Sequence, residues 1–337
     1  MVVAIVLFLV LALIGIEKIS SLVHGVSHHS ARLDGRWLEE SVLENNESKN
    51  KFVVIDIQGI IMDSVDPWTG LSALDFIRDQ LHLAAEDKAV KAVLLRIDSP
   101  GGEVLASDEI AREIRRFQTR TKKPVVASMG SLAASGGYYV AAPCRWIVAN
   151  ELTITGSIGV IMQSYNFRGL LNKVGVRPET FKSGRFKDML SGDREPSEMT
   201  DEERAMIQGL IDETYDRFKT VVAEGRQAAT DANKGEGREL VSNWRNFADG
   251  RVFSGKQAHE LGFVDELGNL EVAYERALEL GGVRSANLIQ YHQPASFANL
   301  FRLFGKAQPP EIKLELGVDL PKLQAGKLYF LSSTVLR

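Results

Sequence analysis

Residues 98–102, DSPGG, and residues 130–139, GSLAASGGYY, are the two stretches that decide the fold. Each follows a short apolar run, at 93–97 and 125–129, of the kind that forms a buried parallel strand, and a helical pattern comes next in the sequence. A strand, a glycine turn and a helix start leave backbone N–H groups pointing at whatever lies above the strand end. Both turns are therefore candidates to hold an oxyanion.

The chain around these turns alternates strands with helices. Strands are expected at 52–57, 92–97, 125–129 and 146–149, and helices at 71–84, 103–118 and 135–142. Such alternation implies right-handed βαβ crossovers and a mostly parallel sheet. Both glycine turns fall at strand ends, where open α/β sheets usually bind their ligands.

Two further segments complete the expected body. Residues 153–162 alternate small and branched side chains, which predicts an exposed strand. It would pair with an extended substrate through backbone hydrogen bonds, or be an ordinary edge strand. A capping box at Thr200–Glu203 predicts a long helix to about Gly225, and another helix is expected at 270–280.

Ser135 is the candidate nucleophile of the second turn. It stands at the start of the expected helix 135–142, where the helix dipole favours a developing negative charge. Gly136 beside it lets a substrate approach without a clashing Cβ. A serine needs a base, and none of the six histidines lies between His82 and His259. A Ser-His-Asp triad would have to recruit a histidine from outside the glycine-rich region, and we rank it second.

Lys187, in the sequence SGRFKD at 183–188, is the alternative base. Lysine accepts a proton only when neutral, so its pKa of about 10.4 must be lowered by about 2 to 3. Burial beside apolar neighbours such as Phe186 would do this, and Arg185 would act in the same direction if its side chain turned inward. Asp188 would oppose the shift unless its carboxylate points away.

Together with residues 155–160 (TGSIGV) and 183–188, the two turns resemble the signal peptide peptidase A family in its short bacterial form, within the Clp protease/crotonase superfamily. The resemblance covers residues 52–282 in order and the tail at 323–331. It implies an α/β fold of repeated ββα units with an N-terminal transmembrane anchor. It also implies that Ser135 is the nucleophile and Lys187 the general base.

The same resemblance assigns roles to the glycine turns. The amides of Gly102 and Gly136 would form the oxyanion hole, and the hydroxyl of Ser157 would orient the lysine. The substrate would bind along four residues: Gly101, Gly156, Ile158 and Gly159. No cofactor and no metal are expected.

The partners also follow from the resemblance. The substrates would be released signal peptides and other extended hydrophobic peptides, cleaved after small or apolar residues. The enzyme would form a ring-like homo-oligomer, and whether one chain supplies both members of the Ser-Lys dyad is left open. Two alternatives remain: a related membrane protease that acts on membrane-protein substrates, and a crotonase-like scaffold that binds without hydrolysis.

The composition is that of a large α/β protein. Of 337 residues, 45% are hydrophobic and 25% are charged, which does not indicate disorder. The formal charge of −4, from 40 basic and 44 acidic residues, gives no reason to expect a nucleic acid partner, and 98–102 lacks the pattern of a phosphate loop. The single cysteine, Cys144, excludes an internal disulfide and is expected to be buried. The pair His28-His29 has no further ligands at metal-binding spacing.

Residues 2–16 form an unbroken apolar run. A helix of this length spans about 22 Å, short of the about 30 Å of hydrocarbon, so the run suits a signal-peptide core or a short membrane anchor. We expect four regions: an anchor at 1–19, a polar linker at 20–51, a peptidase domain at 52–282 and a C-terminal arm at 283–337.

Two criteria disagree on the orientation in the membrane. Lys18, Arg32 and Arg36 follow the apolar run, so the positive-inside rule would place the body in the cytoplasm. The resemblance implies the opposite, a single-pass protein of the bacterial inner membrane with its catalytic domain on the outer, periplasmic side, and we follow it. The apolar patch at 297–304 is expected to contact a neighbouring subunit, the membrane or its own domain.

Overall fold

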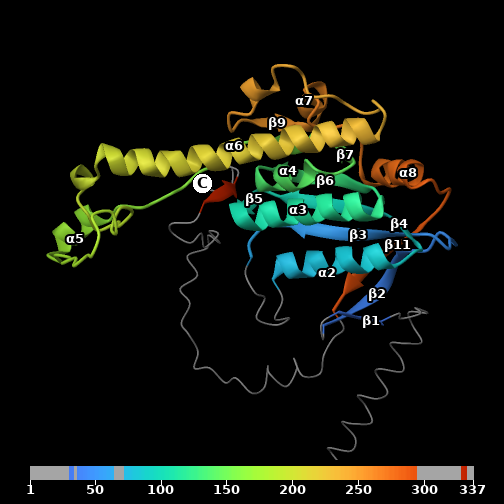
Figure 1. Ribbon diagram of the computed structural model, residues 1–337, viewed down its shortest axis with the longest axis horizontal. Coiled ribbons are helices and arrows are strands. Elements are labelled where there is room, and N and C mark those ends of the chain that lie inside the picture. Colours follow the sequence, from blue (N-terminus) through green and yellow to red (C-terminus); the bar gives the residue numbers. More distant parts are fainter. Residues whose placement is uncertain (1–29, 34–35, 64–71, 294–327, 332–337) are drawn as a thin grey trace, which may run out of the picture.

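The computed structural model describes residues 30–33, 36–63, 72–293 and 328–331. Its strands are β1 (Ser30–Leu33), β2 (Arg36–Glu44), β3 (Lys51–Gln58), β4 (Val90–Ser99), β5 (Gly101–Glu103), β6 (Val125–Ala134), β7 (Trp146–Ala149), β8 (Ile154–Gly156), β9 (Val252–Ser254), β10 (Glu266–Leu267), β11 (Asn287–His292) and β12 (Tyr329–Leu331). Its α-helices are α2 (Ala73–Glu86), α3 (Val104–Thr121), α4 (Gly136–Ala141), α5 (Arg168–Val174), α6 (Asp201–Ala232), α7 (Gly255–Glu260) and α8 (Leu270–Gly281). Figure 1 shows their arrangement.

A parallel sheet forms the centre of the fold. Within the described residues, ten strands join in one sheet whose main path is β1-β2-β11-β3-β4-β6-β7-β10. Off this path, β8 pairs with β6, and β9 pairs with β8. The central strands β3, β4, β6 and β7 run parallel to their neighbours. The expected α/β fold with a mostly parallel sheet is therefore confirmed.

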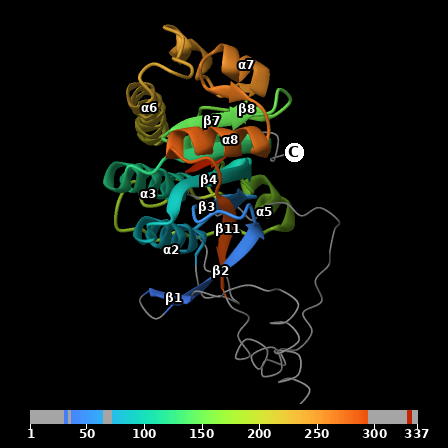
Figure 2. The same ribbon diagram turned by 90° about the vertical axis from the view of Figure 1, so that its right-hand side faces the viewer.

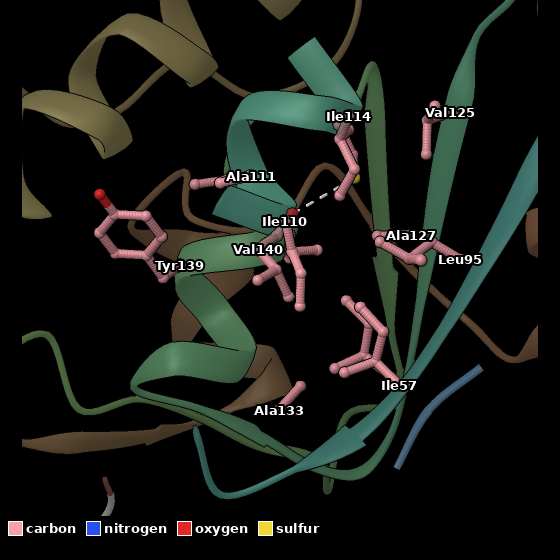
Figure 3. Packing of buried hydrophobic residues seen from close by; sticks show 14 of the residues in the cluster. Ile57, Leu95, Ile110, Ala111, Ile114, Val125, Ala127, Ala133, Tyr139 and Val140 are labelled. Atoms are coloured by element: carbon pink, nitrogen blue, oxygen red, sulfur yellow. Dashed lines mark hydrogen bonds between the residues drawn. The ribbon is translucent and has the colours of Figure 1, made fainter. Parts of the chain in front are cut away.

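Alternate residues of the central strands enter two different cores. On β3, Val53 and Ile55 belong to the core that includes α2, α3 and α4, whereas Phe52 and Val54 belong to the core beneath α8. Figure 2 shows α2 and α3 side by side on the face of the sheet that carries Val53 and Ile55. Figure 3 shows Ile110 of α3 pointing toward the strands. Because both faces are covered, each such side chain contributes about 1.5–3 kcal/mol relative to exposure.

The sheet continues past both expected boundaries of the peptidase domain. Residues 36–44, expected in the polar linker, form β2, and residues 287–292, expected in the C-terminal arm, form β11. β11 pairs antiparallel with β2 and parallel with β3. The ion pair between Lys51 of β3 and Glu40 of β2, at 2.8 Å, also holds β2 to the central strands. These parts of the expected linker and arm are structural strands.

The expected exposed strand at 153–162 is much shorter in the structure. Only Ile154–Gly156 forms a strand, β8, and both of its edges are occupied, by β6 on one side and by β9 on the other. No edge of β8 is left for a substrate. Further along, Ile161 forms an antiparallel bridge with Tyr329.

The helix α6 is longer than expected. It begins at the capping box of Thr200 but continues through Gly225 to Ala232. A Cβ on Gly225 would lie 2.5 Å from the carbonyl oxygen of Ala142, so the glycine permits close packing of α6 against the end of α4 and does not end the helix. The N-terminal half of α6 extends beyond the body in Figure 1 and carries α5; we call residues 163–200 the arm.

The apolar run at 2–16 and the apolar patch at 297–304 lie outside the described residues. Within the part of the chain that the structure describes, no helix combines the length and the apolar character needed to cross a membrane. The expected burial of Cys144 is confirmed.

Candidate active site

Ser135 lies between the end of β6 and the start of α4 in an unusual backbone conformation, with φ 53° and ψ −116°. Its N–H donates to the carbonyl oxygen of Gly156 at 2.8 Å, and its own carbonyl accepts from the N–H of Tyr139 at 2.8 Å. The residue is 1% exposed, and its hydroxyl has no hydrogen-bond partner among the described residues. Strained backbone and an unpaired buried hydroxyl both cost stability, and native proteins keep such features mainly at functional sites.

The two glycine turns meet at this serine, as the sequence predicts. An ideal Cβ on Gly136 would lie 3.0 Å from the amide nitrogen of Gly102 and 3.0 Å from the Cα of Gly101. Gly101 has φ +101°, and a Cβ there would lie 2.6 Å from the nitrogen of Gly136. Only glycine permits this approach from both sides, so the amides assigned to the oxyanion hole are brought together beside Ser135.

The segment 156–159 also lies next to Ser135. Gly156 pairs with Ala134, the last residue of β6, so Ser157 follows directly on the neighbouring strand. Ser157 is 6% exposed and has φ 51°, and its N–H donates to the carbonyl of Arg251 at 2.7 Å. Ile158 is fully buried. A Cβ on Gly159 would lie 3.3 Å from the Cα of Gly250, so this turn too is closely packed.

Lys187 lies elsewhere, exposed on the arm. The arm is fixed to the N-terminal end of α6, where Arg185 pairs with Glu202. Phe218, sixteen residues after Glu202 on the same helix, is the residue that packs on Tyr139 of α4, with ring centroids 4.8 Å apart. Since a helix rises about 1.5 Å per residue, about 24 Å of helix separate the two contacts. A single chain therefore does not bring Lys187 to Ser135.

The charges around Lys187 are paired with one another. The carboxylate of Asp188 accepts from Lys182 at 2.7 Å, and this hydrogen bond lowers the pKa of Asp188. Arg194 donates to Glu203 at 2.8 Å and, with the backbone of Thr200, holds the pKa of Glu203 at about 2. Neither arrangement supplies the apolar surroundings that a neutral lysine requires.

None of the described histidines is paired with the serine. His82 faces Glu86 within α2, His259 accepts from Arg238 at 3.1 Å, and His292 ends β11. Burial and the nearby Arg238 lower the pKa of His259. In the described part of the chain, no cluster of three or more His, Cys, Asp and Glu side chains is placed to hold a metal ion.

The strand β12 passes directly over the first glycine turn, a placement that the sequence did not reveal. It pairs antiparallel with β5, so that Phe330 stands opposite Gly102, and it bridges Ile161 on its other side. The ring of Phe330 is fully buried, with its centroid 4.7 Å from those of Tyr139 and Phe218. An extended chain segment thus fits between β5 and Ile161, beside Ser135.

Known proteins resemble this chain over most of its length. Residues 118–284 match peptidase family S49. A putative signal peptide peptidase SppA from Enterococcus faecium is 40% identical over 263 residues, 75% of this chain and 70% of that protein. A putative protease of Synechocystis sp. is 46% identical over 59% of this chain and 66% of its own length. Protease 4 of Haemophilus influenzae is 33% identical over 74% of this chain but only 38% of its own length.

The fold and these relatives define a serine peptidase. The prediction of a hydrolytic enzyme is therefore confirmed, and the alternative of a crotonase-like scaffold that binds without hydrolysis is not supported. More particularly, the chain belongs to peptidase family S49, with the SppA signal peptide peptidases among its relatives. The structure is also weakly similar to that of the membrane-bound stomatin-specific protease 1510-N, with a TM-score of 0.41 at 16% identity over 76% of this chain and 98% of that one.

Proposed function

We propose that this chain is a membrane-anchored Ser-Lys peptidase with a Clp protease/crotonase-like fold, and that it degrades released signal peptides and other extended hydrophobic peptides. The buried, unpaired hydroxyl of Ser135 is the observation that carries the proposal. Its oxygen attacks the peptide carbonyl while Lys187 takes the proton, and the N–H groups of Gly102 and Gly136 bind the oxyanion. Lys187 then protonates the leaving amine, and water hydrolyses the acyl-enzyme. Ser157 orients the lysine.

The lysine comes from a second copy of the chain. Two observations support this: the exposure of Lys187 on the arm, and the about 24 Å of helix between the arm's attachment and Tyr139. Docking of the arm on a neighbour would bury Lys187 beside Ser135 and lower the pKa of its amine by desolvation. Repetition of this head-to-tail contact, with a rotation that closes, gives a ring.

Exposed apolar side chains on the arm support a docked state. Tyr165 is 74% exposed and Phe181 is 91% exposed, and Phe167, Leu170 and Val174 are also exposed. Soluble proteins rarely leave such a group uncovered unless it contacts a partner.

An extended substrate would pair with β5 in the place that β12 takes in this structure. Backbone hydrogen bonds from strands read an extended peptide without demanding one sequence. Residues 2–16 would anchor the chain in the bacterial inner membrane, with the catalytic body on the periplasmic side. Cleavage of signal-peptide fragments, compared with membrane-protein substrates, tests this substrate class against the related membrane-protease alternative.

Mixing two inactive variants tests the shared dyad. Ser135→Ala retains the lysine and Lys187→Ala retains the serine, so random assembly of equal amounts restores about a quarter of the wild-type sites if neighbours share the dyad. The control is Lys187→Ala mixed with the double variant Ser135→Ala/Lys187→Ala, which restores none. Absence of recovery in oligomers that demonstrably contain both variants would refute a dyad shared between chains.

A further inference from the structure

A cavity of about 240 Å³ lies at the edge of the sheet opposite Ser135. Pro124 lines it just before β6 begins, and Ser135 follows the other end of β6, so roughly 30 Å separate the two places. The C-terminal ends of α3 and α6 form its walls, at the end of the molecule away from the arm in Figure 1. It is lined by Arg115, Gln118, Thr119, Lys122, Lys123, Pro124, Pro143, Arg145, Gly225, Ala228, Ala229 and Ala232.

The side chain of Gln118 links the walls of this cavity through three hydrogen bonds. Gln118 donates to the carbonyl of Pro143 at 2.7 Å and accepts from the N–H groups of Val125 and Arg145. It thereby joins the end of α3 to the start of β6 and to the turn before β7. The cavity is therefore a built feature of the fold.

Four cationic residues line the cavity, and no acidic residue does within the described part of the chain. Arg115 has a partner, Glu224, at 3.2 Å. Arg145 donates only to neutral groups, the side-chain oxygen of Asn233 and the carbonyl of Ala232.

For the other two cations, too, no carboxylate among the described residues lies at hydrogen-bond distance. Lys123 donates to the carbonyls of Ala84, Ala85 and Asp87 at 2.6, 3.2 and 2.7 Å. Lys122 forms no ion pair with any residue that the structure describes. Burial lowers the pKa of Lys123 and, for the same reason, that of Arg145.

Helix dipoles account for only part of this charge. The C-terminal ends of α2, α3 and α6 meet near the cavity, and each carries about half a negative charge. Lys123 and Arg145 bind carbonyls at two of these ends. The carboxylate of Asp87 also acts on Lys123, but it is itself paired with Lys51 at 3.1 Å. Three half charges do not balance Lys122, Lys123 and Arg145, so the cavity keeps a net positive charge.

We propose that this cavity binds a multivalent oxyanion of the phosphate class. Lysine ammonium and arginine guanidinium groups are the usual partners of phosphate oxygens, and the volume leaves room for an organic group esterified to the phosphate. The bound anion joins α3 to α6, the helix that carries the arm at its other end. Binding therefore stabilises the packing of α6 against α3 and the rest of the body.

Thermal unfolding and calorimetry of the full chain in detergent test this site. Inorganic phosphate is titrated against chloride at equal ionic strength, and we expect a saturable rise in Tm. Lys122→Gln weakens phosphate binding about tenfold to a hundredfold, the range for one charge-assisted hydrogen bond. The matched control is Arg120→Gln, which removes the same charge from the last turn of α3 outside the cavity and leaves the affinity unchanged. Arg115→Gln serves as a second cavity variant if Lys122→Gln fails to fold.

Two soluble lipids identify the source of the phosphate. Short-chain phosphatidylglycerol is compared with short-chain phosphatidylcholine in the same titration. Binding of the anionic lipid alone, lost in Lys122→Gln, assigns the site to a lipid phosphate, and binding of inorganic phosphate assigns it to a free anion. An equal loss in Arg120→Gln, or no binding of either phosphate beyond the chloride control, overturns the proposal.

Discussion

Replacement of Phe330 by alanine should detach β12 and leave the rest of the fold intact. The ring is fully buried and lies 4.7 Å from both Tyr139 and Phe218. Loss of a buried phenylalanine costs about 3–5 kcal/mol, including about 0.5–1.5 kcal/mol for each ring pair.

The remaining attachments of β12 are too few to offset this loss. They are a ladder of three residue pairs with β5, two hydrogen bonds of 3.2 Å that Tyr329 and Ile161 exchange, and one of 3.2 Å from Val104 to the carbonyl of Leu328. Each hydrogen bond contributes only about 0.5–1.5 kcal/mol net. In Phe330→Ala the strand should therefore open locally, and amide exchange at Val104 and Ile161 should rise.

Hydrogen exchange by mass spectrometry and urea unfolding measure the two effects separately. We expect faster local exchange with little change in the global free energy of unfolding, and a higher rate of peptide hydrolysis because β12 occupies the proposed path of the substrate. Leu105→Ala is the control, because Leu105 lies in the first turn of the neighbouring helix α3 but is 70% exposed. A fall of the full 3–5 kcal/mol in global stability, without faster local exchange, would show that β12 belongs to the cooperative core and that the reasoning is wrong.

Two further predictions concern the site and the arm. Ser135→Gly should be more stable to urea than Ser135→Ala by about 1 kcal/mol, because glycine relieves the backbone strain at φ 53°, and both should be inactive. Equal stabilities would contradict strain at Ser135. Glu203→Gln should destabilise the start of α6 most above pH 4.5, because the Glu203 carboxylate has a pKa of about 2 in the folded chain and 4.5 as its ordinary value; its contribution is lost as the pH falls through about 2. Urea unfolding across this pH range checks the prediction, and a pH-independent difference between wild type and variant would contradict it.

The centre of the fold was predictable because its signals are local. Strands covered on both faces leave continuous apolar runs, as at β4 and β6, and the βα turns after them are marked by glycine. The strands β2 and β12 gave no such signal. β2 mixes charged and apolar residues, and β12 has only three residues, so each depends on a partner strand far away in the sequence.

The part of the candidate site that lies at the ends of the central strands was also predictable from the sequence. Gly102, Ser135 and Gly136 converge because parallel strands bring their C-terminal ends to one edge of the sheet, and that geometry needs only the strand order. The position of Lys187 depends on how a long helix projects and on what covers the arm. No local pattern encodes either, so the role of Lys187 as the base stays a prediction.

The length of α6 makes the distant end of this protein sensitive to small changes near the middle of the helix. The helix has 32 residues, and Phe218 is a pivot about 24 Å from the residues that hold the arm. A tilt of about 10° at that pivot would swing the arm by about 4 Å, more than a hydrogen bond can span. Substitutions that loosen the aromatic contact would therefore misalign a group on the arm without altering a single residue near it.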